Sequence, residues 1–294
     1  MTHSLSLRRA LFEGVGLRLL AIFLLTAMSA AVHAAAKTVP VGQIVFWRSF
    51  LALGPICFYM HLRGGFRAGL RTRRPGAHAL RGGLGAVSVA LSFLSLAYLP
   101  VASAEALSFL APILTLPLAA LVLKERIGPT AILSVLIGLA GVALMLWSAL
   151  ELPTEGAAIG VAAGLGFALV MAVVRVQVKD MTRSEAPSTI AFYMSVITSL
   201  AALGSAPFGW TAPPPEAWVP LLATGIFGGL AAIAGTEAVA RAPVATLAPI
   251  EYTGLVWALL FDVVLFATLP TWQALLGALT ILAAAALATF GTRR

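Results

Sequence analysis

Long apolar blocks, separated by short breaks that contain proline, glycine or charged residues, run through the whole chain. Most blocks hold about twenty residues, which is the length an α-helix needs to cross the hydrocarbon core of a bilayer. The pattern predicts an all-α polytopic membrane protein with ten transmembrane helices, whose ends are defined to within a few residues. The predicted spans are 14–35, 41–62, 80–98, 101–123, 129–148, 156–178, 188–208, 217–239, 244–266 and 271–290.

Composition excludes the main soluble alternatives. Hydrophobic residues make up 60% of the 294 positions and charged residues only 10%, and the mean hydropathy is +0.99. A soluble globular domain carries about 25% charged residues, and a disordered chain carries still more charge and less hydrophobicity. The net charge of +8 does not indicate nucleic-acid binding, because the basic residues are spread over short breaks and form no basic stripe.

The basic residues predict how the chain is oriented. Positive side chains concentrate on the cytoplasmic side of membrane proteins. If the N-terminus is cytoplasmic, fourteen basic residues fall in cytoplasmic segments and only Lys37 falls in an outer loop. We therefore expect both termini in the cytoplasm of a bacterial-type inner membrane. The fourteen are Arg8, Arg9, Arg63, Arg67, Arg71, Arg73, Arg74, Lys124, Arg126, Lys179, Arg183, Arg241, Arg293 and Arg294.

Several kinds of chemistry lack the residues they need. Cys57 is the only cysteine, and the four histidines are scattered without metal-ligand spacing. The chain contains neither an HExxH nor a GxSxG motif. We therefore expect no metal, no cofactor and no catalytic residue, which makes an enzyme a distant alternative.

A short internal repeat divides the chain into two halves. Residues 97–102 (Ala-Tyr-Leu-Pro-Val-Ala) resemble residues 240–245 (Ala-Arg-Ala-Pro-Val-Ala), at an offset of 143 residues. The same offset aligns Phe109 with Tyr252. We expect two five-helix repeats, 1–148 and 149–294.

The two repeats should insert with opposite orientation, because five is an odd number of spans. The segment 63–74 carries five arginines, whereas its counterpart at 209–216 carries none. Inverted repeats of this kind are common in secondary transporters, where they enclose a central site that opens to each side in turn. A single chain already contains both halves, so a monomer is a plausible working unit.

Motifs in both halves resemble one known family. Phe46-Trp47-Arg48-Ser49-Phe50-Leu51-Ala52 lies in the second block, and Leu99-Pro100-Val101-Ala102-Ser103-Ala104-Glu105 begins the fourth, which ends in Lys124-Glu125-Arg126. In the second half, Pro249-Ile250-Glu251-Tyr252 occupies the corresponding region. These stretches resemble the five-helix unit of the drug/metabolite transporter superfamily, called the EamA-type module. Two positions depart from the family pattern: Tyr252 replaces a usual proline, and Thr268 stands where a second glutamate is common.

The resemblance implies a central cavity for a small solute, and polar or aromatic groups that would be costly against lipid are the candidates to line it. Glu251, near the middle of its span, offers an acceptor, and Trp257 offers an aromatic face. A packing role for these side chains is the alternative. The full candidate set for the cavity is Glu251, Tyr252, Trp257, Ser108, Phe109, Tyr98 and Phe167.

Glu105 and Arg48 form a second candidate group. Both lie in the outer half of their spans, so they are expected to pair with each other, or Glu105 serves the substrate or a coupling proton. Three prolines, Pro112, Pro117 and Pro249, lie within predicted spans and are expected to kink the helices or act as hinges.

Taken together, these features predict an inner-membrane secondary transporter that exports small metabolites by alternating access. Within the superfamily, the chain most resembles the ten-span aromatic amino-acid exporters of bacteria, which implies aromatic or other apolar amino acids as substrates. A multidrug or organic-cation efflux carrier is the close alternative, because Glu251 and Trp257 would also suit a cation. A channel is a more distant one.

The span count can be tested by the accessibility of the two termini. With ten spans, tags at both ends should be labelled only from the cytoplasmic side in oriented vesicles. A C-terminal tag that is reached from the periplasm, with the N-terminal tag inside, would give an odd number of spans and contradict the inverted repeat.

Overall fold

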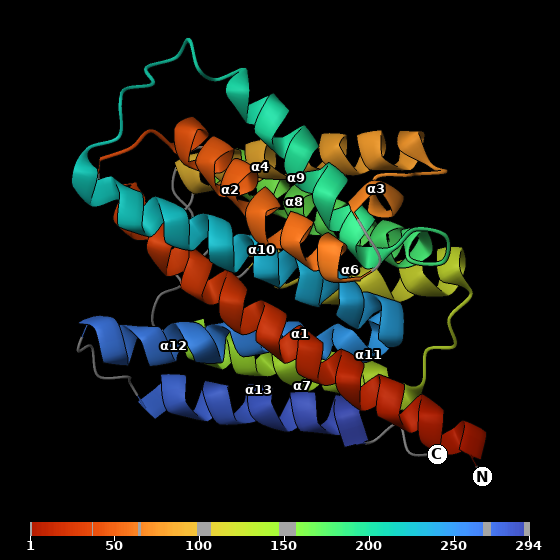
Figure 1. Cartoon of the computed structure of the whole chain (residues 1–294). Coiled ribbons are helices and arrows are strands. Elements are labelled where there is room, and N and C mark those ends of the chain that lie inside the picture. Colours follow the sequence, from red (N-terminus) through yellow and green to blue (C-terminus); the bar gives the residue numbers. More distant parts are fainter. Residues whose placement is uncertain are drawn as a thin grey trace. The chain divides into compact units, whose positions relative to one another are not determined.

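The computed structural model describes residues 2–36, 38–63, 66–98, 107–146, 157–266 and 272–290, and every regular element in these ranges is a helix (Figure 1). In chain order the elements are α1 (Thr2–Ala35), α2 (Val41–Leu62), α3 (Phe66–Gly69), α4 (Pro75–Tyr98), α6 (Ala111–Leu118), the π-helical turn η1 (Ala119–Leu123), α7 (Pro129–Leu146), α8 (Ala157–Met181), α9 (Pro187–Leu203), the 3₁₀ turn η3 (Pro215–Ala217), α10 (Trp218–Arg241), α11 (Val244–Leu247), the 3₁₀ turn η4 (Pro249–Tyr252), α12 (Thr253–Phe266) and α13 (Trp272–Phe290).

The all-helical prediction is confirmed, and helix ends follow the predicted breaks. Helix α2 has the predicted limits 41–62, whereas α1 begins at Thr2, twelve residues ahead of its apolar block. Within the part of the chain that the structure describes, four helices are long and apolar enough to cross a membrane: Arg9–Val32, Val41–Leu62, Ala158–Met181 and Pro215–Arg241. Shorter apolar helices cover Ala111–Leu123, Pro129–Leu144, Pro187–Leu203 and Leu275–Ala288.

The chain forms two compact units, and each unit takes segments from both halves of the sequence. The first unit contains Met1–Val15, Leu84–Asp180 and Arg241–Arg294, and the second contains Gly16–Gly83 and Met181–Ala240. The two compact units therefore do not coincide with the two repeats predicted along the chain.

In the second unit, α2 and α9 pack along each other in opposite directions (Figure 1). The beginning of α2 lies at the end of α9, where a Cβ on Gly42 would meet the Ser205 side chain. The end of α2 lies at the beginning of α9, where Met60 and Ala191 share one hydrophobic cluster. These helices are the second spans of the two predicted repeats.

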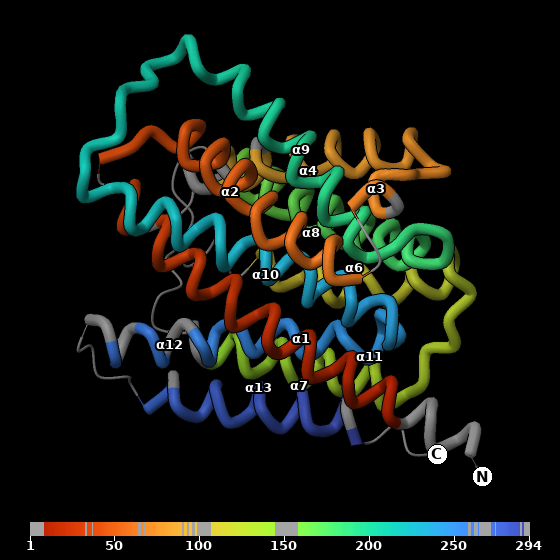
Figure 2. The backbone as a smooth tube through the Cα atoms, viewed as in Figure 1, coloured from red at the N-terminus to blue at the C-terminus, as the bar shows by residue number. Residues whose placement is uncertain are grey.

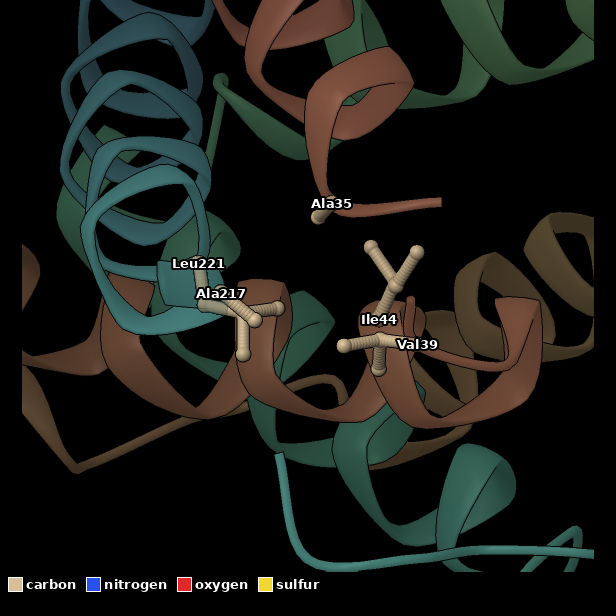
Figure 3. Close-up of a cluster of buried hydrophobic side chains, with 5 residues drawn as sticks. All are labelled: Ala35, Val39, Ile44, Ala217 and Leu221. Carbon is tan, nitrogen blue, oxygen red and sulfur yellow. The ribbon is translucent and has the colours of Figure 1, made fainter. Parts of the chain in front are cut away.

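Helix α10 packs against the same helix, α2, through glycines. A Cβ on Gly225 would lie 2.3 Å from the Leu51 Cβ, and one on Gly229 would lie 2.6 Å from Pro55. Small residues allow the two backbones to approach this closely. At the beginning of both helices, a buried cluster joins them to the end of α1 (Figure 3); its members are Ala35, Val39, Ile44, Ala217 and Leu221.

The arginine-rich segment before α4 is fastened to the beginning of α9. The buried Glu185 carboxylate accepts hydrogen bonds from Thr72 Oγ1 at 3.0 Å and from the Arg73 N–H at 2.9 Å. His78 Nε2 lies 3.8 Å from the same carboxylate. Burial lowers the pKa of His78 more than the nearby carboxylate raises it, so the imidazole is neutral at pH 7.

In the first unit, α7 and α13 form the corresponding pair (Figure 1), and their first residues, Pro129 and Trp272, lie 143 positions apart. The two helices run side by side in opposite directions. A Cβ on Gly141 would lie 2.9 Å from the Gly277 carbonyl oxygen, so the backbones almost touch.

The contacts between equivalent helices bear on the repeat itself. Among the described helices, α2 pairs with its equivalent α9 inside the second unit, and α7 pairs with its equivalent α13 inside the first. Both pairs are antiparallel (Figure 1). The opposite orientation of the two repeats in the membrane stays a prediction. Figure 2 follows the backbone through all four of these helices.

Replacing Gly225 tests the close approach of α10 to α2. Gly225→Ala should lower the free energy of unfolding by about 1–3 kcal/mol, because its methyl group overlaps Leu51. Gly54→Ala is the matched control, since a Cβ there meets nothing within 4 Å and helix propensity alone favours alanine by about 1 kcal/mol. Thermal unfolding in detergent measures both. Equal stability of the two variants would contradict the packing described.

Candidate functional site

The predicted span 244–266 is interrupted in its first half. It consists of α11, the 3₁₀ turn η4 and α12. Pro243 precedes α11, and Pro249 opens η4. A proline nitrogen has no hydrogen to donate, and its ring clashes with the carbonyl four residues earlier, so a continuous helix cannot pass Pro249 undisturbed. Glu251, the leading candidate from sequence, therefore lies on a helix break.

Two long side chains hold the beginning of this segment. Glu125 accepts hydrogen bonds from the backbone N–H groups of Val244 and Ala245, both at 3.3 Å. Lys179 Nζ donates a hydrogen bond of 2.9 Å to the Ala242 carbonyl oxygen. The carboxylate satisfies N–H groups that have no partner inside a helix. The end of the fourth span and the end of α8 are thereby tied to the corner before α11.

The centre of the site is an ion pair between Arg175 of α8 and Glu251 of η4. Their side chains are 17% and 12% exposed, respectively, so both charges are largely removed from solvent. Two opposite charges in a medium of low dielectric constant stabilise each other strongly, while each alone would be costly. Separating the pair therefore costs free energy that a group of a bound solute could offset.

Tyr252, next to Glu251, is fully buried, which differs from a side chain that lines an open cavity. Its ring packs with Val142 and Ile281, and a Cβ on Gly138 would lie 2.2 Å from it. Its hydroxyl donates a hydrogen bond of 3.2 Å to the Phe109 carbonyl oxygen. Tyr252 thus anchors the helix break in the core of the first unit.

Phe109 and Tyr252 are equivalent positions of the two repeats, 143 residues apart, and they touch each other. Their ring centroids are 6.0 Å apart at an interplanar angle of 49°. The repeat alignment made from the sequence therefore pairs two residues that lie in contact within the first unit.

The remaining cavity candidates differ in exposure. Ser108, which precedes Phe109, is half-buried. Trp257, on the helix α12 that follows η4, is half-buried as well. Phe167 is half-buried on α8 and makes no ring contact with Phe109 or Tyr252 within the described ranges. Tyr98, at the end of α4, is 40% exposed. A role of these side chains in binding stays a prediction.

The prolines of the fourth span both lie within the short helix α6, one near each end. Pro112 occupies the first turn of α6, where a missing N–H costs no hydrogen bond of that helix. Pro117 lies inside α6 and is followed directly by the π-helical turn η1. The irregularity therefore follows Pro117, and hinge roles for Pro112, Pro117 and Pro249 stay predictions.

The predicted pair of Arg48 and Glu105 is not described. Glu105 lies outside the residues that the structure describes. Arg48 belongs to the second unit and is half-buried on α2.

Sequence reasoning missed Arg175, because it lies only six residues before the end of α8 and so resembles the basic residues at cytoplasmic ends. The available signal was the series Arg175, Gln177 and Lys179 near the end of this helix. Lys179 is close enough to the helix end to reach the membrane interface, whereas Arg175 lies about one turn deeper.

Comparison with known proteins identifies the family. The sequence matches the EamA-like transporter family at residues 12–147 and again at 158–290. The chain belongs to the EamA-like transporter family. The two matches also show that the EamA unit occurs twice. This protein is therefore a membrane transporter.

Curated relatives cover most of this EamA transporter. It is 30% identical to the pseudopaline exporter CntI of Pseudomonas aeruginosa over 251 residues, 83% of this chain and 84% of that protein. It is 30% identical to a riboflavin transporter of Brucella anthropi, over 84% of this chain and 87% of the relative. An uncharacterized transporter of Helicobacter pylori is 30% identical over 94% of each chain.

A solved crystal structure confirms the fold of this EamA transporter. It superposes with a TM-score of 0.84 over 96% of this chain and 98% of that chain, at 23% sequence identity. Identity at this level supports the fold alone.

Removing one charge of the central ion pair tests its energetics. Glu251→Gln or Arg175→Gln should each lower the free energy of unfolding by about 3–5 kcal/mol, because one uncompensated charge stays in a poorly solvated site. The double variant should lose much less than the sum of the single losses. Thermal unfolding of the four proteins gives the coupling energy, with the exposed Glu216→Gln as control. Additive losses would show that the two groups do not interact.

Proposed function

We propose that this EamA transporter exports a small zwitterionic solute with an aromatic or apolar part, of the size of an aromatic amino acid, across the bacterial inner membrane. The single observation that carries the proposal is the Arg175–Glu251 ion pair on the interrupted segment. A free zwitterion brings one ammonium and one carboxylate. These two groups can replace the partners of Glu251 and Arg175 together, so neither protein charge is left alone.

The surroundings of the ion pair supply the apolar half of such a site. Phe109 packs against Tyr252, the neighbour of Glu251, and Trp257 follows Glu251 by six residues; both side chains are half-buried. Discontinuous helices mark the substrate sites of many secondary transporters, since unwound backbone is tolerated where it lines a cavity. The η4 break next to Glu251 is such a discontinuity.

The relatives support export of an organic solute. One is named an exporter of pseudopaline and another a transporter of riboflavin. The antiparallel packing of equivalent helices supports ten spans in two inverted repeats and transport by alternating access. The distribution of basic residues supports a cytoplasmic location of both termini. If transport is coupled to a proton, Glu251 is the carboxylate at the proposed site that could carry it.

Arg175 separates this proposal from an organic-cation carrier. A cation with no carboxylate could pair with Glu251 but would supply nothing in place of the ion pair that Arg175 makes with Glu251. A cation carrier would need a carboxylate alone. A zwitterion carrier should therefore lose transport when the carboxylate is removed from the solute, whereas a cation carrier should keep it.

Counterflow in proteoliposomes provides the test. Vesicles loaded with L-phenylalanine should accumulate labelled L-phenylalanine, whereas phenethylamine and 3-phenylpropionate, which each lack one charged group, should exchange at least tenfold more slowly. Glu251→Gln and Arg175→Gln should abolish exchange, and Glu216→Gln should keep it. Rapid exchange of phenethylamine without exchange of the amino acid would assign a cation carrier, and absence of flux for all three would overturn the proposal.

A further inference from the structure

The arginine-rich segment 63–74, between α2 and α4, carries five arginines that the proposed solute site does not use. Four of them are exposed: Arg63, Arg67, Arg71 and Arg73. Basic residues are common at the end of a membrane span, so their charge alone does not indicate a binding site. This segment differs from an ordinary basic loop because its backbone is held on two sides.

One side of the arginine-rich segment packs on α2. A Cβ on Gly69 would lie 3.7 Å from the Met60 Cβ, so the chain returns to α2 soon after leaving it. Leu70, which follows, packs against the buried cluster that contains Met60. Arg63 and Arg67 lie in the short loop that these contacts close, so both are held at the end of α2.

The other side of the segment is fastened to the beginning of α9 by hydrogen bonds. Thr189 Oγ1 donates to the Gly69 carbonyl oxygen at 2.8 Å. About one turn farther along α9, the Tyr193 hydroxyl donates to the Leu70 carbonyl oxygen, also at 2.8 Å. The buried Glu185 carboxylate, just before α9, holds the next turn of the segment through two hydrogen bonds. The backbone of the segment is thereby fixed against this helix.

Held residues and exposed arginines alternate along the segment. Leu70 and Thr72 are half-buried, whereas Arg71 and Arg73 are exposed. The Arg73 side chain is exposed although its own N–H donates to the buried Glu185 carboxylate at 2.9 Å. Because the residues between them are fastened, these arginines stay turned outward. A side chain on a fixed backbone loses less freedom when it binds an anion than one on a loose loop, which favours binding.

Arg63 is held over the face of an aromatic ring. Its Cζ lies 5.4 Å from the centroid of the Tyr59 ring, in a cation–π contact. The Tyr59 hydroxyl in turn donates a hydrogen bond of 2.5 Å to the Glu237 carboxylate of α10, which fixes the ring. A guanidinium above a ring still has N–H groups at its edge, and these can donate to an oxyanion.

Exposed apolar side chains adjoin these arginines. Leu62, which precedes Arg63, is 65% exposed, and Phe66, which precedes Arg67, is 39% exposed. Helix α2 is long and apolar enough to cross a membrane, so lipid is the environment that suits apolar side chains at its end. The arginines beside them therefore lie where acyl chains meet phosphate headgroups. This position favours a lipid headgroup over a soluble anion.

From the fixed backbone, the four exposed arginines and the apolar side chains beside them, we infer that the arginine-rich segment is a binding surface for the phosphate headgroups of anionic phospholipids. Guanidinium groups match phosphate oxygens in a two-point geometry. A cluster of basic residues beside a span is also attracted to an anionic membrane surface. The inference goes beyond the proposed solute site and does not depend on the solute. It gives the hydrogen bonds from α9 the role of positioning the arginines.

Lipid-dependent stability tests this surface. The purified protein in a neutral detergent is titrated with phosphatidylglycerol at constant ionic strength, with phosphatidylcholine as the comparison lipid, and the thermal unfolding midpoint is followed. Phosphatidylglycerol should raise the midpoint saturably and more than phosphatidylcholine does. Arg67→Gln combined with Arg71→Gln should weaken the apparent affinity by roughly tenfold, because each basic side chain adds to the attraction. Lys124→Gln combined with Arg126→Gln removes the same charge from exposed positions of the first unit and should titrate like the wild type.

Loosening the segment separates a positioned surface from positive charge alone. Glu185→Ala removes a negative charge from the segment's surroundings, so charge alone predicts tighter binding, whereas we expect binding about threefold weaker because the backbone is released. Thr189→Val combined with Tyr193→Phe changes no charge and should also weaken binding. This pair carries the comparison if Glu185→Ala does not fold. Thr198→Val is the matched control, because its hydroxyl donates to the Met194 carbonyl oxygen of its own helix.

Four results would overturn the inference. The first is a wild type that responds equally to phosphatidylglycerol and phosphatidylcholine. The second is equal weakening in the Lys124→Gln and Arg126→Gln variant, which would reduce the effect to net charge. The third is unweakened binding when the bonds from Glu185, or those from Thr189 and Tyr193, are removed. The fourth is an equal saturable rise with glycerol 3-phosphate alone, which would assign the arginines to a soluble anion.

Discussion

A charged side chain inside a membrane protein needs an opposite charge beside it, and the Arg175–Glu251 ion pair meets this requirement where the ninth predicted span is broken. The break itself follows from Pro249, which removes a backbone donor. Glu125 and Lys179 hold the beginning of the segment, and Tyr252 locks the turn to Phe109. The site is thus a local irregularity that the surrounding packing keeps in one geometry.

That packing rests on contacts between equivalent parts of the two repeats. Helix α7 meets α13, α2 meets α9, and Phe109 meets Tyr252. Lipid offers apolar side chains nearly the same environment as a neighbouring helix, so helices associate in membranes mainly by close fit. Gly141 and Gly225 provide that fit in their respective units.

The two units differ in how they treat charge. In the first, the Arg175 and Glu251 charges neutralise each other in a largely buried ion pair. In the second, the buried Glu185 carboxylate is held by hydrogen bonds from Thr72 Oγ1 and the Arg73 N–H. The known relatives named for pseudopaline and riboflavin show that this family carries organic solutes of more than one kind.

The sequence by itself determined the helical class, the family and most helix ends, because a bilayer imposes one length and one polarity on every span; α2 at 41–62 is the clearest case. It also aligned Phe109 with Tyr252, through the offset of 143 residues. Only the tertiary structure decided that these two rings touch, that Tyr252 is a buried anchor, and that Glu251 has Arg175 as its partner. Those facts depend on which helix faces pack against each other. Hydropathy cannot give this information, because a face buried against another helix and a face turned to lipid are both apolar.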